Sequence, residues 1–310
     1  MKNLLIADIG GTNTRILVTN LDGMVQNEYK MRGLAKAFES NNSIPELEKQ
    51  LEKIPDKEKI GAIAINLGGK NTEQITKSFH KIFPQVPLVI FRESEGCAAF
   101  ALADEYDAQI VLMAGTGTIA VGRSDNGYVT CGGWGMNVGD DGSGYDIGLQ
   151  AIRKTLRALD DTSPLTPLMQ YICKSDGPFC ATETPAQYKD MRDGVREKLY
   201  PLDRQSIASY SKAVYEFAQK GDKTAIEILN YSGKKLSELV ICIAKKLSGK
   251  ISAIVVTGGL VNTRDFWAEN FEGDILNSVP DVKINYVSDG LLKGTLKIAK
   301  DLYKKGEAEK

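Results

Sequence analysis

The chain has 310 residues, 42% of them hydrophobic and 25% charged, and its formal net charge at pH 7 is −1. This length predicts two lobes of about 150 residues with full apolar cores, while the balanced charge argues against a nucleic-acid-binding surface. No apolar run reaches the roughly 18 residues of a membrane helix, and the charged Asp8 comes too early for a signal peptide, so we expect a cytoplasmic protein that binds no membrane.

The first part of the chain predicts three antiparallel strands followed by alternating helices and strands. An apolar run ends at Gly10-Gly11, a hairpin signal lies at Leu21-Asp22-Gly23, and Ser43-Ile44-Pro45-Glu46 is a capping box. These elements predict a mixed sheet that is covered on both faces. We expect strands at 4–9, 15–19, 24–31, 60–66 and 87–91, a helix after Ser43, and helices at 73–83 and 95–106.

The second part of the chain begins in the same way, with a hairpin signal at Asp125-Asn126-Gly127. We interpret the polar, proline- and glycine-containing stretch 160–201 as a peripheral insertion with one helical segment, 165–173. The predicted domains are a first lobe at 1–107, a second at 108–289, and a terminal helix at 290–310 that packs back on the first lobe. We expect strands at 109–114, 119–123, 128–131, 251–257 and 282–287, and helices at 143–159, 205–220, 223–247, 263–271 and 291–305.

Two glycine- and threonine-rich turns, about 105 residues apart, follow corresponding strands of the two lobes. Their context is strand–turn–strand, whereas a Rossmann fingerprint needs a helix directly after its glycines, and no Walker A sequence occurs. An ordinary tight hairpin is the alternative for either turn alone, but two in matching positions favour a pair of phosphate-binding nests. The predicted ATP-binding residues are Gly10, Gly11, Thr12, Asn13, Thr14 and Arg15 in the first turn and Gly115, Thr116, Gly117 and Thr118 in the second.

Three further positions adjoin these turns. Asp8 ends the first strand, where a carboxylate suits Mg²⁺ held partly through water or, alternatively, hydrogen-bonds the turn backbone. Arg15 either neutralises phosphate or lies on the strand surface. Gly258-Gly259 ends an apolar strand, where the backbone approaches a ligand closely or simply turns into the next helix.

The histidine and cysteine content limits the chemistry. His80 is the single histidine, which argues against a Ser-His-Asp triad and leaves a carboxylate as the expected general base. The cysteines form no Cys-x-x-Cys pair and lack zinc-site spacing, so we expect reduced thiols. They are Cys97, Cys131, Cys173, Cys180 and Cys242.

A third glycine-rich segment completes a family resemblance. Gly132-Gly133-Trp134-Gly135 is followed by Gly139-Asp140-Asp141-Gly142-Ser143-Gly144. With the two turns and Gly258-Gly259, it resembles the BadF/BadG/BcrA/BcrD ATPase family, and within it the N-acetylglucosamine kinases of the sugar kinase/Hsp70/actin superfamily. The resemblance implies an α/β fold of two actin-like (ribonuclease H-like) lobes, with ATP and Mg²⁺ in the interlobe cleft, Gly258 and Gly259 at the adenosine, and a homodimer.

The same resemblance implies the residues that act on the acceptor. The family's Asn-Asp-Ala-x-x-Ala motif matches Ser94-Glu95-Gly96-Cys97-Ala98-Ala99, so Glu95 is the implied catalytic base in place of an aspartate. Lys36 and Lys70 stand where the family has asparagine and another polar residue. The implied substrate-binding residues are Lys36, Gly69, Lys70, Trp134, Gly135 and Asp140.

We therefore predict ATP-dependent phosphoryl transfer to a hydroxyl of a small sugar or amino sugar. Lys36 and Lys70 suggest an acidic acceptor such as N-acetylmuramate, unless both point to solvent. One alternative is an ATPase that acts on a partner protein, as the dehydratase and reductase activators do with an iron–sulfur cluster. For such a cluster, Cys131 and Cys173 are the only pair with roughly suitable separation. Another alternative is a nucleotide- or sugar-binding regulatory protein with weakened catalysis.

Overall fold

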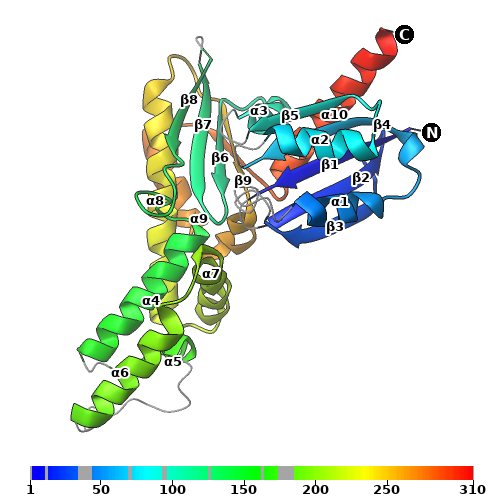
Figure 1. The fold of residues 1–310 in the computed structure, drawn as a ribbon. Helices are drawn as coiled ribbons and strands as arrows, with labels where there is room; N and C mark the ends of the chain where they lie inside the picture. Colours follow the sequence, from blue (N-terminus) through cyan, green and yellow to red (C-terminus); the bar gives the residue numbers. More distant parts are fainter. Residues whose placement is uncertain are drawn as a thin grey trace. The chain divides into compact units, whose positions relative to one another are not determined.

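The computed structural model describes residues 2–10, 13–33, 44–68, 72–92, 96–124, 127–161, 164–173 and 185–309, with the backbone alone at 185–188, 190 and 191. The chain divides into two compact units: unit 1 is Met1–Ala108 with Asp289–Lys310, and unit 2 is Gln109–Ser288. Each contains one five-stranded sheet (Figure 1). In both, the first strand pairs antiparallel with the second and parallel with the fourth. This repeated topology confirms the predicted mixed α/β fold.

Unit 1 is built around the apolar strand β1, in a sheet of order β3-β2-β1-β4-β5. Because side chains alternate along a strand, Leu5 and Ile9 join a core with α1 and α2, whereas Leu4 and Ile6 join a core with α3 and α10. Its elements are β1 (Asn3–Ile9), β2 (Asn13–Asn20), β3 (Val25–Arg32), α1 (Ile44–Glu52), the 3₁₀ helix η2 (Lys57–Lys59), β4 (Ile60–Leu67), α2 (Thr72–Ile82), β5 (Leu88–Arg92), α3 (Cys97–Asp104) and α10 (Gly290–Ala308).

The terminal helix α10 belongs to unit 1, although it follows all of unit 2 in the sequence. Its Leu292 and Ala299 are buried in the same core as Leu4. A Cβ at Gly294 would overlap the carbonyl oxygen of Ala98, so α10 and α3 cross in close contact. The second face of the unit 1 sheet is therefore covered by a segment from the far end of the chain.

Unit 2 has the sheet order β10-β9-β6-β7-β8. The long helix α8 packs on β6, β7 and β8, and α4 and α7 pack on each other. The largest fully buried side chain is Trp267, beside Phe271. The elements are β6 (Ile110–Ala114), β7 (Thr118–Ser124), β8 (Gly127–Gly132), α4 (Gly144–Asp160), α5 (Pro167–Cys173), α6 (Pro185–Leu199), α7 (Arg204–Gln219), α8 (Lys223–Lys246), β9 (Ala253–Thr257), the 3₁₀ helix η4 (Gly259–Phe266), α9 (Ala268–Ser278) and β10 (Lys283–Val287).

Two expectations for unit 2 need correction. The stretch 160–201 contains a second helix, α6, beside the expected one; Val195 and Leu199 form its apolar contact with Leu159 and Cys173. The helix expected at 263–271 is two elements, η4 and α9. They are separated at Trp267, whose Nε1 donates to the carbonyl oxygen of Leu260 at 3.2 Å.

None of the described helices is long and apolar enough to cross a membrane.

Candidate functional site

The turn between β6 and β7 exposes two backbone donors. The first amides of α4 donate into it: Gly144 N–H to Gly115 O at 2.8 Å and Tyr145 N–H to Thr116 O at 3.2 Å. In a trans peptide the carbonyl and the next N–H point in opposite directions, so the N–H groups of Thr116 and Gly117 point away from α4. Neither has a hydrogen-bond partner within the described residues. Two adjacent free amides of this kind form a nest for an anion.

The segment 140–143 holds this turn in place. Thr118 N–H donates to Asp140 Oδ1 at 3.3 Å, and the Thr118 hydroxyl donates to Asp141 O at 3.1 Å. Ser143 caps α4 by accepting from Asp146 N–H at 3.1 Å. The predicted substrate residue Asp140 thus lies directly against the predicted phosphate turn, on buried backbone with φ 63°.

An arginine that the sequence analysis missed completes this cluster. Arg204 Nη2 donates to Asp140 Oδ2 at 2.6 Å, and an alanine Cβ at position 117 would stand 2.6 Å from the same nitrogen. A side chain at position 117 would therefore force the Arg204 guanidinium to move from this place beside the turn. The signal was available in the sequence, because a cation in the first position of α7 opposes the positive N-terminal end of the helix dipole.

The Gly258-Gly259 turn lies beside the Gly115–Thr118 turn. β9 and β6 are neighbouring parallel strands with Thr257 opposite Met113, so both strands end at the same edge of the sheet. Gly258 has φ 105°, and a Cβ there would overlap the carbonyl oxygen of Ala114. Gly259, by contrast, has no heavy atom of the described residues within 4 Å of its Cβ position. The structure thus brings these two predicted ATP segments together.

The predicted substrate segment after β8 is exposed. Trp134 is 78% exposed, and Gly133 N–H donates to Thr118 O at 2.8 Å. Gly132, Gly133 and Gly135 all have positive φ angles, which favour glycine. Trp134 is therefore exposed to solvent, and its segment is attached by this hydrogen bond to Thr118 at the start of β7.

In unit 1, Asp8 lies in a row of polar residues across three strands. Its neighbours in register are Arg15 on β2 and Asn66 on β4. Asn66 Nδ2 donates to Asp8 Oδ1 at 2.9 Å, while Asp8 Oδ2 has no hydrogen bond within the described residues. Burial raises the pKa of Asp8, and the hydrogen bond from Asn66 and the charge of Arg15 offset part of that rise. Asn66 was not predicted, although it is a polar residue at the end of an apolar strand.

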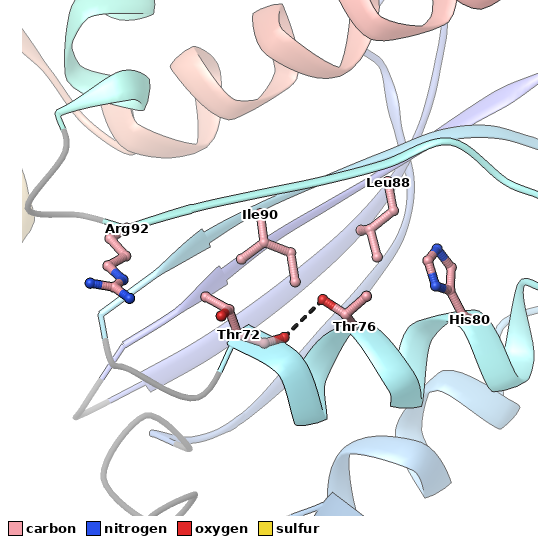
Figure 2. Close-up of a pocket in the computed structure, with 6 residues that line it drawn as sticks. All are labelled: Thr72, Thr76, His80, Leu88, Ile90 and Arg92. Atoms are coloured by element: carbon pink, nitrogen blue, oxygen red, sulfur yellow. Dashed lines mark hydrogen bonds between the residues drawn. The ribbon is translucent and has the colours of Figure 1, made fainter.

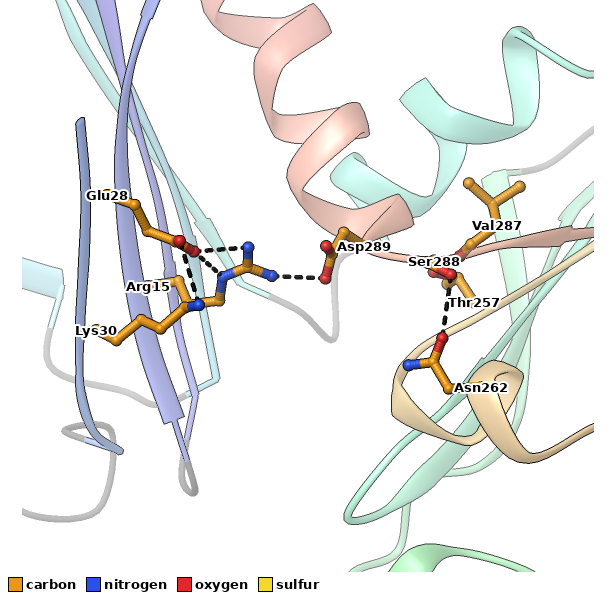
Figure 3. A network of polar contacts seen from close by, with 8 residues as sticks. All are labelled: Arg15, Glu28, Lys30, Thr257, Asn262, Val287, Ser288 and Asp289. Atoms are coloured by element: carbon orange, nitrogen blue, oxygen red, sulfur yellow. Dashed lines mark hydrogen bonds and ion pairs between the residues drawn. The ribbon is translucent and has the colours of Figure 1, made fainter. Parts of the chain in front are cut away.

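Arg15 is paired with carboxylates rather than free. Its Nη2 donates to Glu28 at 2.8 Å and its Nη1 to Asp289 at 2.5 Å (Figure 3). Lys30 also pairs with Glu28, at 3.2 Å. Arg15 could therefore contact phosphate only through the donors that these carboxylates leave free.

Several predicted residues lie outside the described part of the chain: Gly11, Thr12, Lys36, Gly69, Lys70 and Glu95. Of the first turn, Gly10 N–H donates to Asn13 O at 2.9 Å, which closes the β1–β2 hairpin. Gly96, with φ 68°, caps α3, so this helix begins at Cys97, two residues after Glu95.

A cavity of about 350 Å³ lies between α2 and the edge strand β5 (Figure 2). Its walls include Thr72, Thr76, Leu88 and Ile90, with His80 and Arg92 at opposite ends. Thr76 donates to its own helix, to Thr72 O at 2.8 Å. His80 is exposed on α2.

None of the four described cysteines forms a disulfide with another of them. Cys131 on β8 forms a hydrogen bond with Cys242 on α8, and burial together with this neighbour raises the pKa of Cys131 to about 11. Cys173 lies elsewhere, in a small core with Leu159 and Val195.

Comparison with known proteins extends over nearly the whole chain. The N-acetylmuramic acid/N-acetylglucosamine kinase of Clostridium acetobutylicum is 26% identical over 326 aligned residues, covering 97% of this chain and 99% of that protein. The N-acetyl-D-glucosamine kinase of Dictyostelium discoideum is 29% identical over 181 residues, or 56% of this chain and 54% of that protein. Among solved structures, a ROK family glucokinase from Streptomyces griseus, in complex with glucose and AMPPNP, has a TM-score of 0.63 at 14% identity, covering 96% and 99% of the two chains. That similarity shows the fold.

The family assignment rests on a family model that matches most of the chain. The model of the BadF/BadG/BcrA/BcrD ATPase family matches residues 7–295, from β1 into α10. The match includes both glycine- and threonine-rich turns, the Trp134 segment and the Gly258-Gly259 turn, which are the features that carried the resemblance. The chain therefore belongs to the BadF/BadG/BcrA/BcrD ATPase family.

Proposed function

We propose that this protein is an ATP-dependent kinase that transfers a phosphoryl group to a hydroxyl of a small sugar or amino sugar. The observation that supports this most directly is the pair of free amides at Thr116 and Gly117, beside the end of β9. Family membership and the similarity to the Clostridium acetobutylicum kinase support the same reaction. Phosphoryl transfer depends mainly on positioning and charge neutralisation, which a rigid amide nest supplies.

We propose an N-acetylated amino sugar as the acceptor, with acidic sugars such as N-acetylmuramate included. Lys36 and Lys70 motivate the acidic part of this proposal, since each replaces a neutral polar residue of the family pattern. A lysine ammonium meets a carboxylate as a point charge and tolerates several geometries. The Clostridium acetobutylicum relative is named for both the neutral and the acidic sugar.

Glu95 is the proposed base for the acceptor hydroxyl, and Asp8 the proposed residue on the metal side. The donor set near Asp8 fits Mg²⁺, because Asp8 Oδ2 and the side-chain oxygen of Asn66 are the hard oxygen ligands that this ion takes. Bound Mg²⁺ would neutralise charge on the nucleotide phosphates. Asn66 fixes the orientation of the Asp8 carboxylate through its hydrogen bond.

Release of ADP in the presence of different acceptors tests this proposal. Purified protein with Mg-ATP would be given N-acetylglucosamine, N-acetylmuramate, glucosamine and glucose in turn, and the product identified by mass spectrometry. We expect phosphorylation of an N-acetylated sugar. A rate of ADP release that is the same with and without each sugar would contradict the kinase proposal. It would favour an ATPase that acts on a partner protein.

A regulatory protein is the second candidate, favoured by the replacement of the family's Asn-Asp pair by Ser94-Glu95. Binding of ATP and sugar without any turnover would identify a regulatory protein.

The proposal also includes a cytoplasmic homodimer that binds neither membranes nor nucleic acid. Light scattering at several protein concentrations would measure the oligomeric state.

A further inference from the structure

Arg204 is a charged donor that lies against Gly117 in the β6–β7 turn. Its Nη2 is held by Asp140 at 2.6 Å, close to the Gly117 Cα. Its Nε is buried and has no hydrogen-bond partner within the described part of the chain. A guanidinium has five N–H donors, and most of those on Arg204 are not used by the described residues.

We propose that Arg204 binds the phosphate chain of the nucleotide, and that Asp140 is the positioning residue that holds it there. This inference rests on the proposed ATP-dependent function. An anion seated on the amides of Thr116 and Gly117 lies next to the guanidinium, because that group packs against Gly117. A positioned guanidinium matches phosphate oxygens with paired donors, which a backbone nest alone does not provide.

Asp140 suits this positioning role through both of its oxygens. Oδ1 accepts the Thr118 N–H and Oδ2 accepts from Arg204. Asp140 is 4% exposed, and the Arg204 side chain is 25% exposed. The carboxylate thus ties the arginine to the turn itself, while a quarter of the arginine side chain stays open to a ligand.

Replacing Arg204 alone also leaves the Asp140 carboxylate without its ion-pair partner. The buried Asp140 carboxylate would lose its cation, which destabilises the fold and repels phosphate. The informative variant is therefore Asp140→Asn/Arg204→Gln, which removes both charges, studied beside Arg204→Gln and Arg204→Lys. Arg157→Gln is the matched control, since Arg157 is an exposed arginine on α4 of the same unit.

Calorimetry would measure the affinities of Mg-ATP, tripolyphosphate and adenosine, with melting curves to confirm folding. We expect the double variant to lose roughly 10- to 100-fold in ATP affinity, the range for one lost charged hydrogen bond. Adenosine affinity should stay within about twofold, and tripolyphosphate binding should fall together with that of ATP. Arg204→Lys should retain part of the ATP affinity, and Arg157→Gln all of it.

Three results would overturn the assignment. Wild-type ATP affinity in the double variant would show that Arg204 only neutralises Asp140. An equal loss for ATP and adenosine would show that the pair merely supports the turn. A wild-type protein that binds neither ATP nor tripolyphosphate would contradict the proposed nucleotide site itself, and the assignment with it, whereas the first two results leave that site intact.

Discussion

Replacing Gly258 with alanine should destabilise unit 2 through two separate effects. The φ angle of 105° is one that a residue with a side chain rarely adopts, at a cost of about 1–3 kcal/mol. The new Cβ would also stand 2.7 Å from Ala114 C and overlap the adjoining oxygen, and overpacking of this kind costs about 1–3 kcal/mol. The free energy of unfolding should therefore fall by roughly 2–6 kcal/mol.

Thermal melting followed by circular dichroism would measure this effect. For a domain of this size, each kcal/mol lowers Tm by roughly 2–4 °C, so we expect a decrease of roughly 5–20 °C. The matched control is Gly259→Ala, because no atom of the described residues lies within 4 Å of its Cβ position and its φ is not positive. Its Tm should stay within about 2 °C of the wild type. Equal Tm values for the two variants would refute the argument from backbone geometry.

Three further predictions concern the base, a thiol and a helix cap. Glu95→Gln keeps the side-chain shape but removes its basicity, so kcat should fall about 10²- to 10⁴-fold at unchanged ATP affinity; full activity would mean that the base lies elsewhere. The pKa of Cys131 is raised to about 11, and only the thiolate reacts with iodoacetamide. At pH 8, labelling of Cys131 in the folded protein should therefore be slower than in the unfolded chain by about tenfold or more. The labelling rate should increase as the pH rises. A rate equal to that of unfolded protein would show that the thiol is not protected. The Asp222 carboxylate accepts hydrogen bonds from the N–H groups of Ala225 and Leu168. Asp222→Ala should therefore lower the free energy of unfolding, measured by urea titration, by roughly 2–4 kcal/mol. A loss below about 1 kcal/mol would contradict the double capping role.

The strands and most helices could be predicted because their signals are local. β1 is apolar except for Asn3 and Asp8, and the glycines that end β1 and β6 mark turns. The α6 helix was missed because its apolar contacts are few and the preceding residues carry turn signals. Its few apolar contacts, at Val195 and Leu199, are made with α4 and α5, which a single helix sequence does not show.

The candidate site was only partly predictable, for a related reason. The glycine turns are contiguous motifs, and the sequence marks them directly. Arg204 lies 64 residues from Asp140, and its role depends on how α7 packs on α4. The residues Glu95, Lys36 and Lys70 were reached through family resemblance alone, so their roles remain predictions.

The position of α10 has a consequence for folding during synthesis. The sheet face formed by Leu4, Ile6, Ala62 and Ala64 is completed by Leu292 and Ala299. On the ribosome, the N-terminal residues of unit 1 emerge first, and until α10 has been translated only α3 can cover part of their second apolar face. Unit 2, contiguous in sequence from Gln109 to Ser288, can complete its own core earlier. We therefore expect unit 2 to complete its core before unit 1, the reverse of the usual order in which N-terminal domains fold first.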